Sequence, residues 1–178
     1  GTTYTDNTAG SGTNYFYVVT ATGNGGTSTN SLAISGTPQA LTLVAADVGT
    51  VGTAGSTTNS SGVWTVKGAG GDIGGGADSG HFAYQNMLGD GEVIARLTNA
   101  TWVSSAGKIG LMMRVGTNTD AAEASLVFDR GQSSTPRVFY RRTTADGNTY
   151  NFSGAANQSL PLWLRLRRAG NSFTAYTS

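Results

Sequence analysis

Short runs of Val, Leu, Tyr, Phe and Thr recur along the whole chain, and this recurrence limits the possible folds more than any other feature. Gly, Thr and Asn separate the runs, and no sustained 3.6-residue periodicity indicates a helix. Many short strands at such spacing are typical of a sandwich or barrel, so the sequence predicts an all-β fold. The runs that predict strands are Tyr15–Thr20, Gly62–Lys67, Glu92–Thr98, Lys108–Val115, Ala124–Asp129, Arg137–Arg142, Leu162–Arg167 and Ser172–Thr177.

Alternation within these runs assigns residues to the two faces of a sheet. In Leu162–Arg167 every second residue is Leu, while Trp163 and Arg165 stand between them. Arg96 and Arg114 occupy the equivalent positions of two other runs. Because successive side chains of a strand point to opposite faces, we expect one apolar face and one face rich in Arg and aromatic residues.

The composition excludes several classes of function. Charged residues make up 12% of the chain and the net charge is +1, so no strong field attracts nucleic acid. The chain has no Cys, which removes disulfides, thiolate nucleophiles and Cys-type zinc sites. No apolar run approaches the roughly 20 residues of a membrane span, so we expect no membrane insertion. A surface kept soluble by hydroxyl and amide groups favours a secreted or cell-surface protein, and we expect a bacterial one. The lack of Cys fits bacterial exported proteins as well as it fits cytosolic ones.

A domain boundary is expected near Thr37-Pro38-Gln39. Tyr-rich strands precede it, and a Gly-rich segment follows from residue 48 to residue 80. The sequence therefore predicts one domain over residues 1–38 and a second over residues 39–178.

The first domain carries a recognisable order of motifs. They are Thr3-Tyr4-Thr5-Asp6, then residues 12–21 around Tyr15, then Ser31–Ser35. This order resembles the last strands of a fibronectin type III domain. The resemblance implies a partial fibronectin type III-like sandwich in which the tyrosine at position 15 links the two sheets.

The second domain carries a longer ordered set of motifs. They are Ala46–Gly49, Ala54–Ser56, Trp64–Ile73, Asp78, His81-Phe82, Gly89–Arg96, Ala106–Arg114 and Trp163–Asn171. This set resembles the DUF1349-like, concanavalin A-like jelly rolls of bacterial secreted proteins. The resemblance implies a concanavalin A-like jelly-roll β-sandwich, a lectin-like fold often attached to polysaccharide-degrading enzymes. The family pattern continues past Ser178 and the first domain lacks opening strands, so both chain ends are expected to lie within domains.

A set of cationic and aromatic side chains forms the candidate ligand-binding site. Sugar binding uses an aromatic plane for the face of the ring and forked donors for its hydroxyl groups. The residues that supply both are Arg96, Arg114, Arg141, Trp163 and Arg165. The alternative is that Trp163 packs in the core and the Arg residues form ion pairs between strands.

Metal and catalytic sites are weakly indicated. Asp47, Asp72 and Asp78 are the candidate ligands of a structural calcium ion, which would be the sole cofactor expected. No catalytic residue is predicted: His81 is the only His, and no Gly-x-Ser-x-Gly nucleophile elbow accompanies it. We expect His81 to make ordinary hydrogen bonds near a strand end. Asp90 and Glu92 lie in and beside a turn, which explains them better than a glycosidase pair.

These observations predict a non-catalytic extracellular carbohydrate-binding or adhesion module within a larger secreted or cell-surface protein. Its expected partner is a polysaccharide or glycan, with no nucleic acid. One alternative is a structural repeat of a surface fibre or stalk, in which exposed strand edges are completed by neighbouring copies. A second alternative is an accessory region of a polysaccharide-degrading enzyme.

Overall fold

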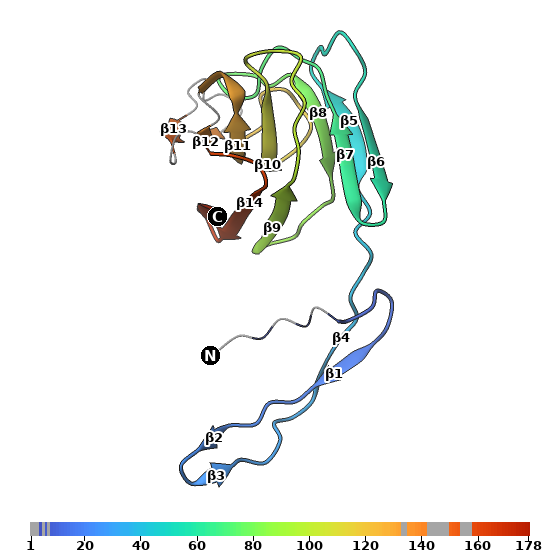
Figure 1. Cartoon of the computed structure of the whole chain (residues 1–178), viewed down its shortest axis with the longest axis vertical. Coiled ribbons are helices and arrows are strands. Elements are labelled where there is room, and N and C mark those ends of the chain that lie inside the picture. Colours follow the sequence, from blue (N-terminus) through green and yellow to red (C-terminus); the bar gives the residue numbers. More distant parts are fainter. Residues whose placement is uncertain (1–3, 5, 7, 133–134, 142–149, 154–157) are drawn as a thin grey trace. The chain divides into compact units, whose positions relative to one another are not determined.

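The computed structural model describes residues 4, 6, 8–132, 135–141, 150–153 and 158–178. The chain divides into two compact units, Gly1–Thr42 (unit 1) and Leu43–Ser178 (unit 2) (Figure 1). The division follows Thr42, close to the boundary expected at Pro38. The regular elements of both units are strands, and the single helical element described is a 3-10 turn, η1 (Arg130–Gln132). The all-β prediction is therefore confirmed. No helix of the described residues has the length and apolar character needed to cross a membrane.

Unit 1 consists of two short antiparallel pairs of strands. β1 (Tyr15–Tyr17) pairs with β4 (Ile34–Gly36), and β2 (Thr22–Gly23) pairs with β3 (Gly26–Thr27). The residues between the pairs also hold the two sides together, because the backbone N–H of Ser31 donates to the carbonyl of Val19 at 2.9 Å. The result is a long, narrow ribbon rather than a layered sheet.

Tyrosine hydroxyl groups fix the start of this ribbon. The backbone N–H of Gly10 donates to the Tyr15 hydroxyl at 2.8 Å, and the Tyr17 hydroxyl donates to the Asp6 carboxylate at 3.0 Å. Desolvation and this bond to Asp6 raise the pKa of Tyr17. Hydrogen bonds from Thr8, and to a smaller extent from Tyr17, lower the pKa of Asp6. Local order in unit 1 thus depends on polar contacts.

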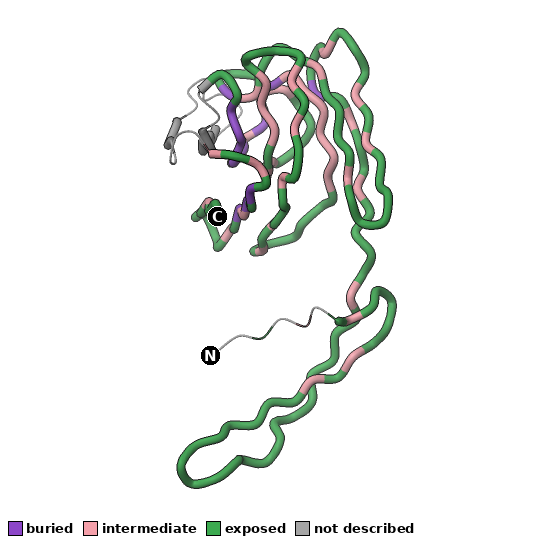
Figure 2. Tube along the Cα trace, in the orientation of Figure 1, coloured by how far each residue is buried: buried purple, intermediate pink, exposed green. Residues whose placement is uncertain are grey.

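Unit 1 has no buried residue among those described, as Figure 2 shows. Phe16 is 71% exposed, Ile34 71% and Leu32 96%. The other exposed large apolar residues of the unit are Tyr4, Val18, Val19 and Leu41. Its strands therefore pair without covering an apolar core.

Unit 2 contains two larger antiparallel sheets. The four-stranded sheet has the order β10-β11-β12-β13, and the three-stranded sheet has the order β15-β14-β9. The strands are β9 (Gly91–Leu97), β10 (Lys108–Arg114), β11 (Glu123–Asp129), β12 (Thr135–Arg141), β13 (Tyr150–Ser153), β14 (Leu162–Ala169) and β15 (Ser172–Thr177). Two further pairs complete the unit. They are β5 (Val44–Val48) with β8 (Gly80–Tyr84), and β6 (Ser56–Ser60) with β7 (Val63–Lys67).

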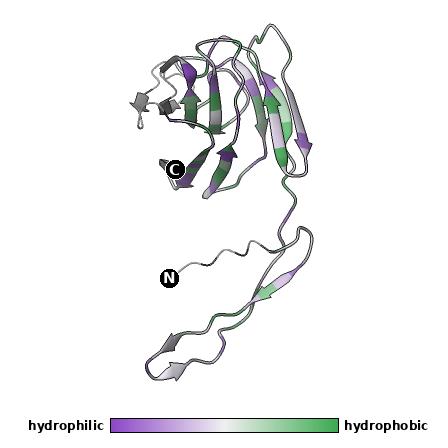
Figure 3. Ribbon diagram, in the orientation of Figure 1, coloured by the Kyte–Doolittle hydropathy of each residue, from purple (hydrophilic) through white to green (hydrophobic). Residues whose placement is uncertain are grey.

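The core of unit 2 lies between the two larger sheets. Leu126 and Phe128 on β11 meet Leu162 and Leu164 on β14, and all four are at most 3% exposed. Residues packed around them include Leu97, Trp102, Ile109, Leu111, Leu160 and Ala175. Hydrophobic and hydrophilic residues share the same strands, as Figure 3 shows. Unit 2 is thus β-sandwich-like, with the predicted apolar face of Leu162–Arg167 turned inward.

Candidate functional site

The outer face of the β15-β14-β9 sheet brings together aromatic and cationic residues from three adjacent strands. Trp163 on β14 lies opposite Arg96 on β9, and Arg165 lies between Ile94 on β9 and Tyr176 on β15. Residues directly opposite each other in a sheet share a face, and the intervening Leu residues are buried. We call this surface the Trp163 face. It comprises Glu92, Ile94, Arg96, Trp163, Arg165, Arg167, Thr174 and Tyr176.

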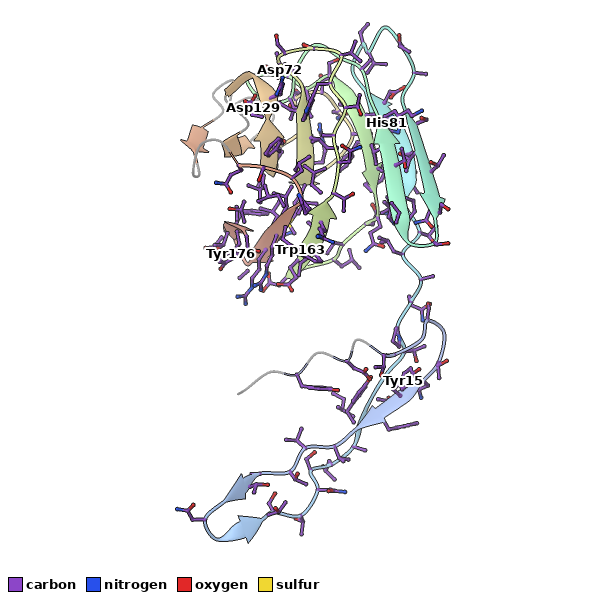
Figure 4. All side chains as sticks on the ribbon, in the orientation of Figure 1. Tyr15, Asp72, His81, Asp129, Trp163 and Tyr176 are labelled. Atoms are coloured by element: carbon purple, nitrogen blue, oxygen red, sulfur yellow. The ribbon has the colours of Figure 1, made fainter. Side chains whose placement is uncertain are left out.

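A hollow of about 390 Å³ lies on the Trp163 face. Its lining residues are Ile94, Trp163, Arg165, Tyr176, Thr177 and Ser178. Trp163 is 49% exposed and Tyr176 46%, and Figure 4 shows both side chains in the same region of unit 2. The volume falls at the lower end of the range of roughly 300–1,000 Å³ that is typical of small-molecule sites. The hollow therefore offers two accessible aromatic rings beside a forked hydrogen-bond donor.

Arg165 is held in place from two sides. Its Nε and Nη2 atoms donate to one carboxylate oxygen of Glu92 at 3.0 and 2.6 Å. Its guanidinium carbon also lies 5.1 Å from the centre of the Tyr176 ring. The ion pair is partly solvated and contributes at most about 1 kcal/mol, but it fixes the guanidinium against the ring.

Arg96 and Arg167 differ from Arg165 in having no such partner. Both side chains are exposed. Within the part of the chain that the structure describes, neither makes a side-chain hydrogen bond or ion pair. The Trp163 face therefore holds three Arg residues and one Glu, and two of its guanidinium groups are free to meet a ligand.

A hairpin turn braces one end of this surface. Gly170 joins β14 to β15 with a φ of 58°, which favours Gly because a side chain would be strained there. The Gly170 N–H donates to the Asp90 carboxylate at 2.6 Å, and Arg168 Nε donates to the Gly170 carbonyl at 3.0 Å. Since Asp90 directly precedes β9, the turn ties all three strands together.

The structure does not place Arg114 on the Trp163 face. Arg114 is on β10 of the other sheet, and its side chain is 3% exposed. Its guanidinium pairs with Asp78 at 2.9 Å, donates to the Gly116 carbonyl at 2.6 Å and also donates to the Asn118 carbonyl. It lies 5.8 Å from the centre of the Phe82 ring. Through these contacts Arg114 connects β10 to loop residues within unit 2.

Arg141 also belongs to the other sheet, because it lies on β12 opposite Glu123 of β11. Its side chain is outside the described residues. Of the five predicted ligand-binding residues, the structure thus brings together Arg96, Trp163 and Arg165.

The three candidate calcium ligands make separate pairs with basic side chains. Asp47 accepts from His81, Asp72 from Lys108 and Asp78 from Arg114. Across the described ranges, no group of three or more His, Cys, Asp or Glu side chains could hold a metal ion. Within the described residues, each of the three carboxylates therefore lies beside a different basic side chain.

His81 links an acid and a hydroxyl group. Its Nδ1 atom lies 2.7 Å from Asp47 and its Nε2 atom 3.0 Å from Thr57. The bond from His81, followed by that from the Gly55 N–H, lowers the pKa of Asp47. A Cβ atom on Gly55 would lie 2.2 Å from His81 Nδ1, so only Gly allows the chain to approach the ring this closely.

The same connectivity of acid, imidazole and hydroxyl occurs in hydrolases. Here the imidazole side chain is 5% exposed, and Thr57 points toward that covered ring and does not line the hollow. We therefore assign the three residues to holding β5, β6 and β8 together. The expectation that His81 makes ordinary hydrogen bonds on a strand is confirmed.

Sequence reasoning missed Tyr176, Ile94 and Arg167 as members of the site. Alternation already placed Ile94 with Arg96 and Arg167 with Trp163. The missing information was which strands are neighbours, since only the pairing of β14 with both β9 and β15 brings these residues together.

No protein-family model matches the chain, and no curated protein or solved structure shows detectable similarity to it. The fold and site define it by themselves as an all-β, β-sandwich-like protein with a solvent-exposed aromatic and Arg surface on one sheet.

Proposed function

We propose that this chain is a non-catalytic carbohydrate-binding or adhesion module of a larger secreted or cell-surface protein. The hollow beside Trp163, Tyr176 and Arg165 carries this proposal. An exposed indole can stack on the apolar face of a sugar ring, and a guanidinium can donate to its hydroxyl groups. Such a module also suits the accessory region of a polysaccharide-degrading enzyme.

We further propose that unit 1 is the end of a fibronectin type III-like domain and that unit 2 is a concanavalin A-like jelly roll. The hydrogen bond between Tyr15 and the Gly10 backbone, a few residues upstream, supports the first assignment because tyrosine corners make such a bond. Two facing antiparallel sheets with a shared apolar core support the second.

Affinity electrophoresis in gels containing plant, algal or bacterial polysaccharides would test the binding function. We expect at least one polysaccharide to retard the chain and Trp163→Ala to abolish the retardation. Phe173→Ala is the matched control, because Phe173 is an aromatic residue of the same sheet with 45% exposure that does not line the hollow. Retardation that survives Trp163→Ala, or no retardation by any polysaccharide tested, would contradict the proposal.

A second candidate function is assembly with neighbouring copies through added strands, as in a surface fibre. The exposure of Phe16, Leu32 and Ile34 on the two-stranded ribbon of unit 1 favours it, because exposed apolar strands are templates for pairing. Sedimentation velocity should then show mass increasing with protein concentration, and Ile34→Asp should reduce this association. A monomer at every concentration would exclude this function.

A further inference from the structure

The Trp163 face concentrates positive charge that the chain as a whole lacks. Arg96, Arg165 and Arg167 against Glu92 give this surface 3 − 1 = +2, whereas the whole chain carries +1. The rest of the chain has 11 − 3 = 8 basic and 10 − 1 = 9 acidic side chains, a net charge of −1, so the positive excess is local.

Arg96 is placed to contact a substituent of any ring that lies on Trp163. The two residues face each other across β9 and β14. Side chains opposite each other in an antiparallel pair have Cβ atoms roughly 4.5–5.5 Å apart, and the Arg96 side chain is long enough to reach past the edge of the indole. Arg96 is exposed and, among the described residues, has no hydrogen bond or ion pair to give up on binding.

Arg165 has a different part in the same surface. Glu92 already neutralises it, and the Tyr176 ring lies beside it. It can donate to hydroxyl groups, but it adds little net charge. The uncompensated charge comes from Arg96 and from Arg167, which follows Arg165 on the same face of β14.

We infer that the ligand of the Trp163 face is an anionic polysaccharide, whose carboxylate or sulfate group pairs with Arg96 while its ring stacks on Trp163. This inference rests on the proposed carbohydrate-binding function. A guanidinium makes paired, charge-assisted hydrogen bonds with planar or tetrahedral oxyanions. Hydroxyl groups of a neutral sugar would leave the charges of Arg96 and Arg167 without a counter-charge, so an anionic sugar fits this surface better.

Isothermal titration with matched pairs of polysaccharides tests the inference. Polygalacturonate is compared with its methyl ester to test a carboxylate, and a sulfated galactan is compared with its desulfated form to test a sulfate. We expect the acidic member of at least one pair to bind about tenfold more tightly, the ratio that one charge-assisted hydrogen bond commonly supplies. The pair that shows the preference identifies the anion. Raising the salt concentration should reduce the preference, because solvent-exposed charges are screened.

Two variants separate the parts of the site. Arg96→Gln should remove most of the preference for the acidic polymer and retain binding of the neutral one, whereas Trp163→Ala should remove binding of both. Arg130→Gln is the control, because it removes the same charge from an exposed Arg that lies outside the Trp163 face. Thermal unfolding of each variant establishes that it is folded before titration.

The outcomes distinguish this inference from the function on which it rests. Equal binding of acidic and neutral members, or a preference that Arg96→Gln leaves unchanged, would overturn the anionic ligand and leave carbohydrate binding intact. A preference that Arg130→Gln removes as well would assign it to the net charge of the chain and would also overturn the inference. The absence of binding to every polymer would overturn both.

Discussion

Units 1 and 2 are built from similar short strands and differ in what their apolar side chains contact. In unit 2, Leu126 and Phe128 of one sheet meet Leu162 and Leu164 of another, and water is excluded from all four. In unit 1, the apolar residues of the ribbons stay exposed, and Leu32 is 96% accessible. The comparison shows that strand pairing alone organises a backbone, while a second layer is needed to bury its side chains.

The two units also differ in whether they bury a polar pair. Arg114 and Asp78 of unit 2 form an ion pair whose side chains are 3% and 2% exposed. In unit 1, the bonds of Asp6 with Thr8 and Tyr17 lie at the surface or near it. Breaking a buried ion pair leaves a charge inside the protein, whereas breaking a surface bond leaves its groups in water. Substitutions at these contacts should therefore lower the free energy of unfolding by unequal amounts in the two units.

The largest expected effect is that of Arg114→Met. Removing the guanidinium breaks the buried ion pair with Asp78, which should lower the free energy of unfolding by about 3–5 kcal/mol. Urea unfolding followed by tryptophan fluorescence measures unit 2 alone, because Trp64, Trp102 and Trp163 all lie in it. Arg167→Met, at an exposed position, should change stability by less than about 0.5 kcal/mol. Equal losses of stability for Arg114→Met and Arg167→Met would contradict this difference between buried and exposed positions.

A slightly smaller effect is expected from opening the core. Leu164→Ala should cost about 2–5 kcal/mol, because Leu164 is 1% exposed and its truncation leaves a cavity. Leu32→Ala in unit 1 should change the free energy of unfolding by no more than about 0.5 kcal/mol. Urea titrations followed by circular dichroism compare the two. A large loss from Leu32→Ala would show that unit 1 buries this residue in solution, for example against another copy.

Hydrogen exchange should resolve the two units without any substitution. Amide groups of β11 and β14 lie in the middle of sheets over the core, so their exchange should require global opening of unit 2. Amide groups of β2 and β3 should exchange much faster, because only a two-stranded ribbon protects them. Mass spectrometry of peptic fragments measures both. Comparable protection would mean that unit 1 gains a second layer in solution.

The smallest expected effect is the pH dependence of the contact between Asp47 and His81. The pKa of Asp47 is lowered in the fold, so its contribution to stability is complete above the unfolded value of about 3.9 and is lost as the pH falls through the folded value. Asp47→Asn should therefore lower the stability of unit 2 at neutral pH and make it less dependent on pH in this acidic range.

Asp6→Asn is the matched control for this prediction, because the pKa of Asp6 is also lowered but the residue lies in unit 1. Tryptophan-detected unfolding between about pH 2 and pH 7 should respond to Asp47→Asn and not to Asp6→Asn. Identical pH profiles for both variants and the unsubstituted chain would show that the Asp47 contact has no measurable effect.

Much of the fold could be predicted because apolar alternation marks a strand by itself. In Leu162–Arg167 the pattern gives both the strand and its buried face, and the structure confirms both. β6 carries no such signal, since Ser56–Ser60 contains only Ser, Thr and Asn. β8 begins at a Gly and has residues of intermediate burial throughout. Strands that face water, or that lie at the edge of a unit, are stabilised by pairing with another strand. The local sequence pattern of a strand does not show which strand will pair with it.

For the candidate site, too, the sequence predicted the faces of single strands. Alternation placed Arg96, Trp163 and Arg165 on outward faces, and pairing of β9 with β14 brings them together. The same pattern also placed Arg114 opposite an apolar face, but loops cover that side of β10 and bury it. Which face of a strand is solvated depends on distant segments, so the separation of Arg114 from the others could not be found from spacing.

The brace formed by Gly170 and Asp90 has a consequence for recognition. The Gly170 bond to Asp90 fastens β9, β14 and β15 at one end, and the pair with Glu92 holds the Arg165 guanidinium in the absence of any ligand. For the proposed carbohydrate ligand, association would then need little reorganisation of Arg165, and less conformational entropy would be lost on binding. If the Trp163 face binds a glycan as proposed, a guanidinium held in this way would favour ligands whose hydroxyl groups match its position.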